Sequence, residues 1–475
     1  MRRILLVAGA VVAGALALPG AAAAHGLVAR ADLPIPHWLF GWAAAMVLVV
    51  SFVALAVLWP DPRLQEERWR PLPGGLGRLL GSRPVEIACG AIGAFLFGVI
   101  IYAGLRGTES AQANFVPTFI YVIFWLALVP ASVLFGDVFK AFNPWRAIGR
   151  FAGWVAARAA RADPPAPLAY PERLGHWPAA AGIFAFAVME LVVSGGDKPE
   201  SLAIATLIYS AITFVAMALY GVETWIERGE AYSVYFNLFS RFSVFETRDR
   251  VVGIRRFLSG LPALRPTYGT VPLLAVMIGS VTFDGASEGE LWTSIAPDIV
   301  DFFRDVGFSL ERSLELSFLV GLLVAIGLVY ALYRLGVVGA RSVGGGFSTT
   351  RLARAFIHSL VPIALAYVAA HYITLLLFQG QAISYLASDP LGDGSDLFGT
   401  ADSQIDFTLI GATATWYWQV AFVVTGHVLA LTLAHDRAID LYEDAKLAVR
   451  SQYWMLAIMI GFTSLALFLL SQANA

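Results

Sequence analysis

The sequence predicts an all-α polytopic membrane protein with about ten transmembrane helices after an N-terminal signal. Hydrophobic residues make up 58% of the 475 residues and charged residues only 14%, whereas soluble domains carry about 25% charged residues. Ten apolar runs alternate with polar segments, and the basic residues are concentrated in every second segment. The net charge of −2 gives no indication of a nucleic-acid partner. The expected partner is the lipid bilayer, and the expected location is the cell membrane.

The first 24 residues, "MRRILLVAGAVVAGALALPGAAAA", are typical of a cleavable signal peptide. Arg2 and Arg3 form its basic end, an apolar core follows, and three alanines precede the cleavage point. Cleavage there makes His25 the first mature residue and leaves 25–475 as a single transmembrane domain. An uncleaved first helix is the alternative.

All but one of the apolar runs are long enough to cross a bilayer, which takes about 17–25 residues. They fall at 38–59, 85–105, 115–135, 177–193, 202–226, 270–283, 313–335, 352–378, 413–434 and 453–471. With the mature N-terminus outside, 25 of the 32 Lys and Arg residues lie in the five segments predicted inside, and five lie outside. This bias predicts that both mature termini are outside. It also requires the short run 270–283 to cross, because otherwise every later segment would carry the wrong charge.

Run 270–283 covers only about 20 Å at ~1.5 Å per residue, less than the ~30 Å hydrocarbon core. We therefore expect this helix to break or to stop inside the membrane, with residues 280–290 lining an outward-facing vestibule. Asp284 and Ser287 then lie at a similar depth to His371 and Glu190. Polar residues inside a span are costly, which makes each of them a candidate functional residue.

A histidine and several carboxylates around one cavity suit a hydrolytic divalent metal ion. We expect His371 and Asp284 as metal ligands, with Glu190 or Asp389 as a further ligand or base. Asp389 begins the acidic loop "DPLGDGSDLFGTADSQID". The alternative is a solvated acidic loop and a hydrogen-bonded core histidine.

Two further pairs of histidines are candidate ligands. His358 and His427 lie at similar depth on neighbouring antiparallel spans and could bind a metal or a haem together, or simply contact each other. His25 would offer both an α-amine and an imidazole after signal cleavage, a chelate suited to copper, and His37 lies near the same surface. Any residue can follow a cleavage site, so the position of His25 can also be incidental.

The segment "GASEG" matches the Gly-x-Ser-x-Gly nucleophile elbow of many serine hydrolases, with Ser287 as the serine. An elbow needs a strand before it and a helix after it, whereas this motif follows a membrane span. We therefore expect Ser287 to line the cavity rather than to act as an elbow nucleophile.

Five segments resemble actinobacterial integral membrane proteins labelled fenitrothion hydrolase. They are "AHGLVARADLPIP", "VTFDGASEG", "FIHSLVPIALAYVAAHYITLLLFQGQ", "SDPLGDGSDLFGT" and "AVRSQYWMLAIMIGFTSLALFLLSQANA". The resemblance implies hydrolysis of an organophosphate triester, an apolar aryl ester, to a phenol and a dialkyl thiophosphate. It carries no catalytic motif, so the site residues above come from depth and chemistry alone.

Two other functions fit the same pattern. Ten spans, one of them short, and intramembrane carboxylates suit a transporter, channel or metal-handling permease equally well. A haem-binding redox protein that uses His358 and His427 is a third interpretation. The sequence therefore predicts a hydrolase with a transporter as the alternative.

Overall fold

The computed structural model describes residues 37–65, 68–160, 166–442 and 444–472. Within these ranges, nine helical segments are long and apolar enough to cross a membrane, and α9 is a shorter apolar helix. The prediction of a polytopic helical membrane protein is therefore confirmed for this part of the chain. The predicted signal peptide, 1–24, lies outside the described residues.

The apolar segments correspond closely to the predicted runs. They are α2 (His37–Leu58), α4 (Arg83–Arg106), α5–η3–α6 (Phe115–Pro117, Thr118–Ala127 and Leu128–Phe135), α9 (Trp177–Leu191), α10 (Pro199–Tyr220), α13 (Thr270–Ser287), α15 (Leu310–Ser342), α16–η4–α17–η5–α18 (Thr349–Phe356, Ile357–Ser359, Leu360–Gln379, Gly380–Ala382 and Ile383–Ser388), α19 (Ala412–Leu441) and α20–α21 (Ala445–Ser451 and Tyr453–Gln472). The other helices are η2 (Pro73–Gly75), α3 (Leu76–Leu80), α7 (Val138–Phe142), α8 (Pro144–Ala160), α11 (Val222–Arg228), α12 (Ala231–Ser240) and α14 (Glu290–Asp305).

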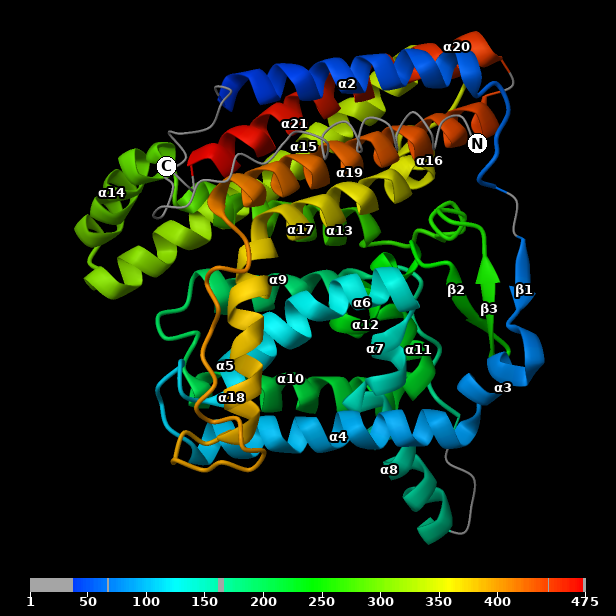
Figure 1. Cartoon of the computed structure of the whole chain (residues 1–475). Helices are drawn as coiled ribbons and strands as arrows, with labels where there is room; N and C mark the ends of the chain where they lie inside the picture. Colours follow the sequence, from blue (N-terminus) through cyan, green and yellow to red (C-terminus); the bar gives the residue numbers. More distant parts are fainter. Residues whose placement is uncertain (1–36, 66–67, 161–165, 443, 473–475) are drawn as a thin grey trace.

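The long helices run side by side in two groups (Figure 1). One group contains α4, η3–α6, α9 and α10, and the other contains α2, α13, α15, α17, α19 and α21. The groups meet where α9 packs on α13 and where η3 packs on α17. Helix α12 lies inside the molecule against α6 and α9.

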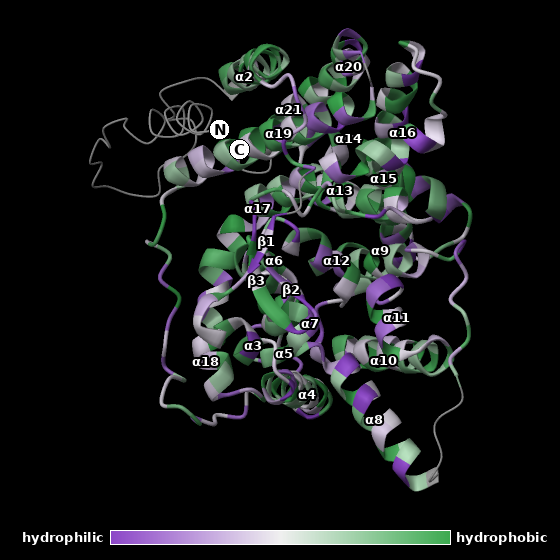
Figure 2. Cartoon of the chain, turned by 90° about the vertical axis from the view of Figure 1, so that its right-hand side faces the viewer, coloured by the Kyte–Doolittle hydropathy of each residue, from purple (hydrophilic) through white to green (hydrophobic). Residues whose placement is uncertain are grey.

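A small antiparallel sheet at one end of the bundle departs from the all-α expectation. It consists of β1 (Trp69–Pro71), β2 (Phe245–Arg248) and β3 (Val251–Arg255), in the order β1-β3-β2. Asp249 and Arg250 between β2 and β3 both have positive φ, as a tight two-residue hairpin turn requires. We name this end of the bundle the sheet end and the opposite end the loop end. Figure 2 looks onto the sheet end and shows hydrophilic residues among the strands and along α8.

Contacts at the two ends agree with the predicted grouping of inside and outside segments. At the sheet end, the Asp436 carboxylate accepts hydrogen bonds from the Trp59 indole and from the backbone of Leu64, which joins segments 60–84 and 435–450. At the loop end, the backbone N–H of Thr108 donates to the carbonyl of Leu391 at 2.8 Å. In these two cases, segments predicted to share a side of the membrane therefore share an end of the bundle.

Helix α13 corrects the expectation of a broken or shortened sixth span. It is one continuous helix of 18 residues that includes Asp284 and Ser287, and most of its side chains are buried. At about 1.5 Å per residue it covers roughly 27 Å. The helix continues past the apolar run because the Asp284 carboxylate is hydrogen-bonded to a neighbouring helix rather than solvated. Residues 280–287 are therefore helical and do not form an irregular vestibule wall.

Helix α12 was not expected inside the bundle, because the sequence predicts no apolar run between the runs 202–226 and 270–283. Tyr235, Phe236 and Phe239 are all at most 1% exposed, and the helix has only 10 residues, too few to cross. Segment 222–240 therefore enters the bundle and returns to the sheet end, as backbone at membrane depth can do when protein surrounds it.

Candidate functional site

The centre of the candidate site is the Asp284 carboxylate. Its Oδ2 atom lies 2.9 Å from His371 Nε2 and accepts a 2.6 Å hydrogen bond from the Tyr372 hydroxyl. The side chains of His371 and Asp284 are 17% and 21% exposed, respectively. The expectation that Asp284 and His371 lie together is confirmed by this contact, which joins α13 to α17.

Glycines on α13 allow this helix to pack closely against α15 and α17. A Cβ at Gly279 would lie 2.6 Å from the Cα of Ile326, so α13 and α15 are in close backbone contact there. A Cβ at Gly285 would lie 3.4 Å from His371 Nδ1, an ordinary contact distance. The imidazole therefore lies against the surface of α13, with Nδ1 toward Gly285 and Nε2 toward Asp284.

Glu190, the penultimate residue of α9, brings a second carboxyl group to the site. It interacts electrostatically with Asp284 and with the phenol groups of Tyr121 and Tyr372. We find no hydrogen bond to the Glu190 side chain within the described ranges. We name Glu190, Asp284, His371 and Tyr372 the acid–base cluster. It draws on both helix groups.

A π-helix borders this cluster. The ten residues of η3 have this geometry, which is rare and is often found at functional sites. The widened turn carries Tyr121, whose hydroxyl donates to the Gly196 carbonyl at 2.9 Å. It also carries Trp125, which stacks on Tyr235 with a centroid distance of 4.5 Å. Aromatic side chains therefore enclose the acid–base cluster on the side of α12.

The acid–base cluster consists of side chains that can exchange protons. An ionised carboxylate can only accept hydrogen bonds, so with Asp284 ionised both His371 Nε2 and the Tyr372 hydroxyl donate to it. Two carboxyl groups held near each other repel when both are ionised, and one bound proton removes the repulsion. The cluster can therefore bind and release a proton without a cofactor.

The cavity beside His371 is smaller than the vestibule expected from the sequence. Its volume is about 20 Å³, and its lining includes Thr282, Gly285 and Tyr367. A single water needs about 10–15 Å³ by this measure. The cavity can hold one water molecule next to the ring of His371, but not an aryl phosphotriester.

Ser287 is not an elbow nucleophile. It is the last residue of α13, and its hydroxyl donates to the Asp284 carbonyl at 2.8 Å, a contact within the helix. Gly289 precedes α14, so the motif lies between two helices and has no strand before it.

Asp389 is not part of the acid–base cluster. Its two carboxylate oxygens accept the backbone N–H groups of Asp393 and Gly394 at 3.0 and 2.9 Å, inside its own loop. In the same loop, the Ser395 hydroxyl lowers the pKa of Asp393 by hydrogen bonding. Asp389 therefore stabilises its own loop, and its expected role as ligand or base stays a prediction.

The expected metal centre has too few ligands. Among the described residues, no group of three or more His, Cys, Asp or Glu side chains could hold a metal ion. Asp284 Oδ2 and His371 Nε2 lie 2.9 Å apart, but no third side chain of these types completes a site with them among the described residues. His25 lies outside the described residues, and His37 begins α2 without a described side chain.

No hydrogen bond joins His358 to His427 in the described part of the chain. His427 Nδ1 lies 2.8 Å from the Val423 carbonyl, and its ring lies 6.4 Å from that of Tyr367. His358 lies near the backbone carbonyl of Leu433 instead, almost two helical turns further along α19. The expected hydrogen-bonded pair is therefore not formed, and the joint ligation of a metal or a haem stays a prediction.

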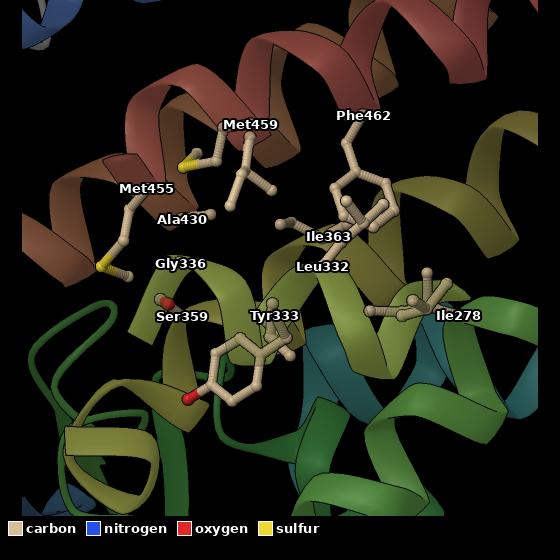
Figure 3. Close-up of a pocket in the computed structure, with 13 residues that line it drawn as sticks. Ile278, Leu332, Tyr333, Gly336, Ser359, Ile363, Ala430, Met455, Met459 and Phe462 are labelled. Carbon is tan, nitrogen blue, oxygen red and sulfur yellow. The ribbon is translucent and has the colours of Figure 1, made fainter. Parts of the chain in front are cut away.

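A second, apolar cavity of about 40 Å³ lies near these helices (Figure 3). Aliphatic and thioether side chains such as Ile278, Leu332, Met455 and Met459 line it. It is far smaller than a haem or an aryl ester. Neither of the two cavities therefore supports the cofactor or the substrate considered from the sequence.

Sequence reasoning missed three tyrosines of this region. Tyr372 follows His371 directly, and a polar hydroxyl group within an apolar span could have marked it as a site residue. Tyr121 and Tyr232, whose phenol groups interact electrostatically with Glu190, gave no such signal, because aromatic residues are common in membrane helices and at their ends.

Comparisons with protein-family models, with curated proteins and with solved structures found no match for this chain.

Proposed function

We propose that this protein is a membrane permease that translocates protons through the acid–base cluster. The observation that carries the proposal is the hydrogen bond between Asp284 and His371 at the contact of the two helix groups, with Glu190 beside it. Ionisable residues inside a membrane are costly and are typical of ion and proton pathways. Imidazole is the side chain whose protonation ordinarily changes near neutral pH, and carboxyl groups can act as its partners in proton transfer.

The architecture around the cluster supports the same proposal. Transporters often place their sites between two helix groups, next to helices that are interrupted within the membrane. Here α17 is flanked by two short 3₁₀ segments, Ile357–Ser359 and Gly380–Ala382, and η3 is a π-helix. These irregular segments are places where the helices can change their relative arrangement.

Proton flux into proteoliposomes tests the proposal. The purified protein is reconstituted with a trapped pH-sensitive dye, a pH gradient is imposed, and the membrane potential is clamped with potassium and an ionophore. Asp284→Asn should reduce the flux at least about tenfold, while the control Ser287→Ala should stay within about twofold of the wild type. Equal flux through Asp284→Asn and the wild type contradicts the proposal.

Hydrolysis of organophosphate triesters is the second candidate, and one observation favours it. The Nδ1 edge of His371 faces Gly285 beside a cavity of the size of one water, while Nε2 contacts Asp284. A carboxylate-oriented imidazole can act as a general base toward such a water. This mechanism needs no metal ion, but it does need the cavity to widen for an aryl ester.

Turnover of an aryl phosphotriester by the purified protein separates the two candidates. A hydrolase should release the phenol, should lose this activity in His371→Gln, and should keep it in the presence of a chelator. Absence of phenol release from protein that conducts protons leaves the permease as the function.

We further propose that the sheet end faces the cytoplasm and that both mature termini are outside. The support is the concentration of Lys and Arg in the segments of the sheet end. A reporter that is active only in the cytoplasm should be silent when fused after the last residue, and N-terminal sequencing should begin at His25. A cytoplasmic signal would reverse the orientation.

A further inference from the structure

Helix α8 packs on the bundle only along its first half. Trp145 Nε1 donates a hydrogen bond to the Ser210 hydroxyl of α10 at 2.7 Å. A Cβ at Gly149 would lie 2.9 Å from Met217 Sδ, also on α10. Residues 151–156, by contrast, are all exposed, and α8 runs across the long helices and extends away from them (Figures 1 and 2). We name residues 151–159 the outer half of α8, which the rest of the described chain leaves largely uncovered.

Helix α8 crosses α4 at a depth inside the membrane region. A Cβ at Gly90 would lie 2.9 Å from the Cβ of Ala147, so the two helices are in close contact there. Gly90 is seven residues after Arg83, the first residue of α4, which corresponds to about 10 Å along the helix. Amphipathic helices at a membrane surface place their apolar face about 5–10 Å into the boundary between headgroups and acyl chains. Helix α8 therefore lies at the depth of an interfacial helix.

Ion pairs fix which side of α8 faces the sheet end. The Arg146 guanidinium pairs with Glu86 at 2.7 Å and with Glu223 at 3.1 Å. Arg150 pairs with Glu223 at 2.7 Å. Glu86 also pairs with Arg250 of the turn between β2 and β3, at 2.8 Å. The side of α8 that carries Arg146 and Arg150 therefore points toward the sheet end.

The opposite side of the outer half is apolar and points toward the middle of the membrane. At about 100° per residue, Val155 lies about 180° around the helix from Arg146, and Phe151 lies about 140° from it. Phe151 is 64% exposed and Val155 is 42% exposed. On α4, Ile87 lies three residues before Gly90 and is 70% exposed. The apolar side of α8 therefore continues the lipid-facing surface of a membrane-spanning helix.

Trp154 and Arg158 lie between these two sides. The Arg158 guanidinium is 4.9 Å from the centroid of the Trp154 ring, and Trp154 is 55% exposed. Indole rings are enriched at the level of lipid headgroups, and an arginine stem can lie along apolar surface while its charge stays at the interface. Helix α8 has three arginines and no acidic residue, and basic residues near a leaflet attract anionic headgroups. The charge of the helix therefore complements an anionic leaflet.

We propose that the outer half of α8 lies in the leaflet at the sheet end, with Phe151 and Val155 among the acyl chains and Arg158 at anionic phospholipid headgroups. This interaction does not depend on proton translocation. It anchors the sheet end of α4 and α10 at the membrane surface.

Two other surroundings of the outer half make different predictions. A helix that only links two spans would project into water, and both of its sides would then be open to an aqueous quencher. A second copy of the chain packed on the apolar side would shield that side from water and from lipid alike.

The experiment attaches an environment-sensitive fluorophore to one cysteine, introduced as Phe151→Cys, Val155→Cys or Gly153→Cys. Cys89, the only cysteine in the sequence, is first replaced by alanine. Gly153 is the matched control, because it lies about 20° around the helix from Arg146 and a Cβ there would meet no atom within 4 Å. The purified protein is reconstituted in vesicles of phosphatidylcholine and phosphatidylglycerol, in which one lipid or the other carries brominated chains, and iodide is the aqueous quencher.

Brominated chains should quench the labels at 151 and 155 at least about twofold more than the label at 153, and iodide should give the reverse order. Brominated phosphatidylglycerol should quench the label at 155 more than brominated phosphatidylcholine, and Arg158→Gln should remove this difference.

Three results would overturn the proposal. Equal quenching by iodide at all three positions would place the helix in water. Protection of positions 151 and 155 from both quenchers would indicate a protein partner instead of lipid. Equal quenching of the label at 155 by the two brominated lipids would exclude the role of Arg158 at anionic headgroups.

Discussion

Breaking the hydrogen bond between Asp284 and His371 should cost a measurable but modest free energy. Double-mutant cycles on polar contacts between membrane helices give about 0.6 kcal/mol on average and ~1.7 at most. A hydrogen bond to an ionised group is roughly twice as strong as a neutral one. At a separation of 2.9 Å and with both side chains about one-fifth exposed, we expect a coupling of about 1–2 kcal/mol.

The assay is a double-mutant cycle of Asp284→Leu and His371→Phe, with reversible unfolding followed in mixed micelles. Leucine approximates the shape of aspartate and phenylalanine approximates the ring, so each change removes the contact and keeps most of the packing. Asp284→Leu also removes the hydrogen bond from Tyr372, but this loss occurs both with His371 and with His371→Phe, so it cancels in the cycle. A control cycle of Asp284→Leu with Tyr333→Phe should give less than about 0.5 kcal/mol, as expected for distant sites. A coupling free energy between Asp284 and His371 no larger than that of the control cycle would refute the reasoning.

Three further outcomes follow from packing, titration and ligand chemistry. Gly279→Ala should destabilise the protein by about 1–3 kcal/mol, because its Cβ would lie 2.6 Å from the Cα of Ile326, whereas Gly327→Ala, with no atom within 4 Å, should be neutral or slightly stabilising. Burial, with smaller contributions from Arg241 and Arg228, lowers the pKa of His176 to about 4 from its usual 6.5. The unfolded chain therefore binds a proton on His176 that the folded chain does not, so the free energy of unfolding should fall by up to ~3 kcal/mol between about pH 6.5 and 4, and His176→Gln should flatten the profile measured by thermal unfolding. A metal chelator should leave the proton flux unchanged, and a loss of flux restored by one metal ion would show that a metal acts after all.

Much of the helical organisation could be predicted from residues alone. The apolar runs correspond to helices because each must satisfy its own backbone hydrogen bonds in lipid, and the charge bias grouped the polar segments by end. The same bias required run 270–283 to cross, which placed Asp284 near His371. The hydrogen bond between them confirms that argument from depth.

The predicted details failed where tertiary contacts decide the conformation. The end of α13 was placed too early because an aspartate was taken as a boundary, whereas Tyr372 and His371 satisfy its carboxylate inside the bundle. The strands have only three to five residues, too few for an alternating pattern to be distinct. Residues 227–240 lie between two predicted runs and were expected outside the bundle, whereas α12 packs inside it against α6 and α9.

Voltage-clamp recording of the reconstituted protein tests most directly whether protons are the ion that passes through the acid–base cluster. The current should reverse at a potential that shifts by about 59 mV per unit of pH difference across the bilayer, the value for a single transferred charge. It should not respond to replacement of sodium, potassium or chloride, and Asp284→Asn should abolish it. A reversal potential that follows another ion, or an unchanged current in Asp284→Asn, would contradict the account.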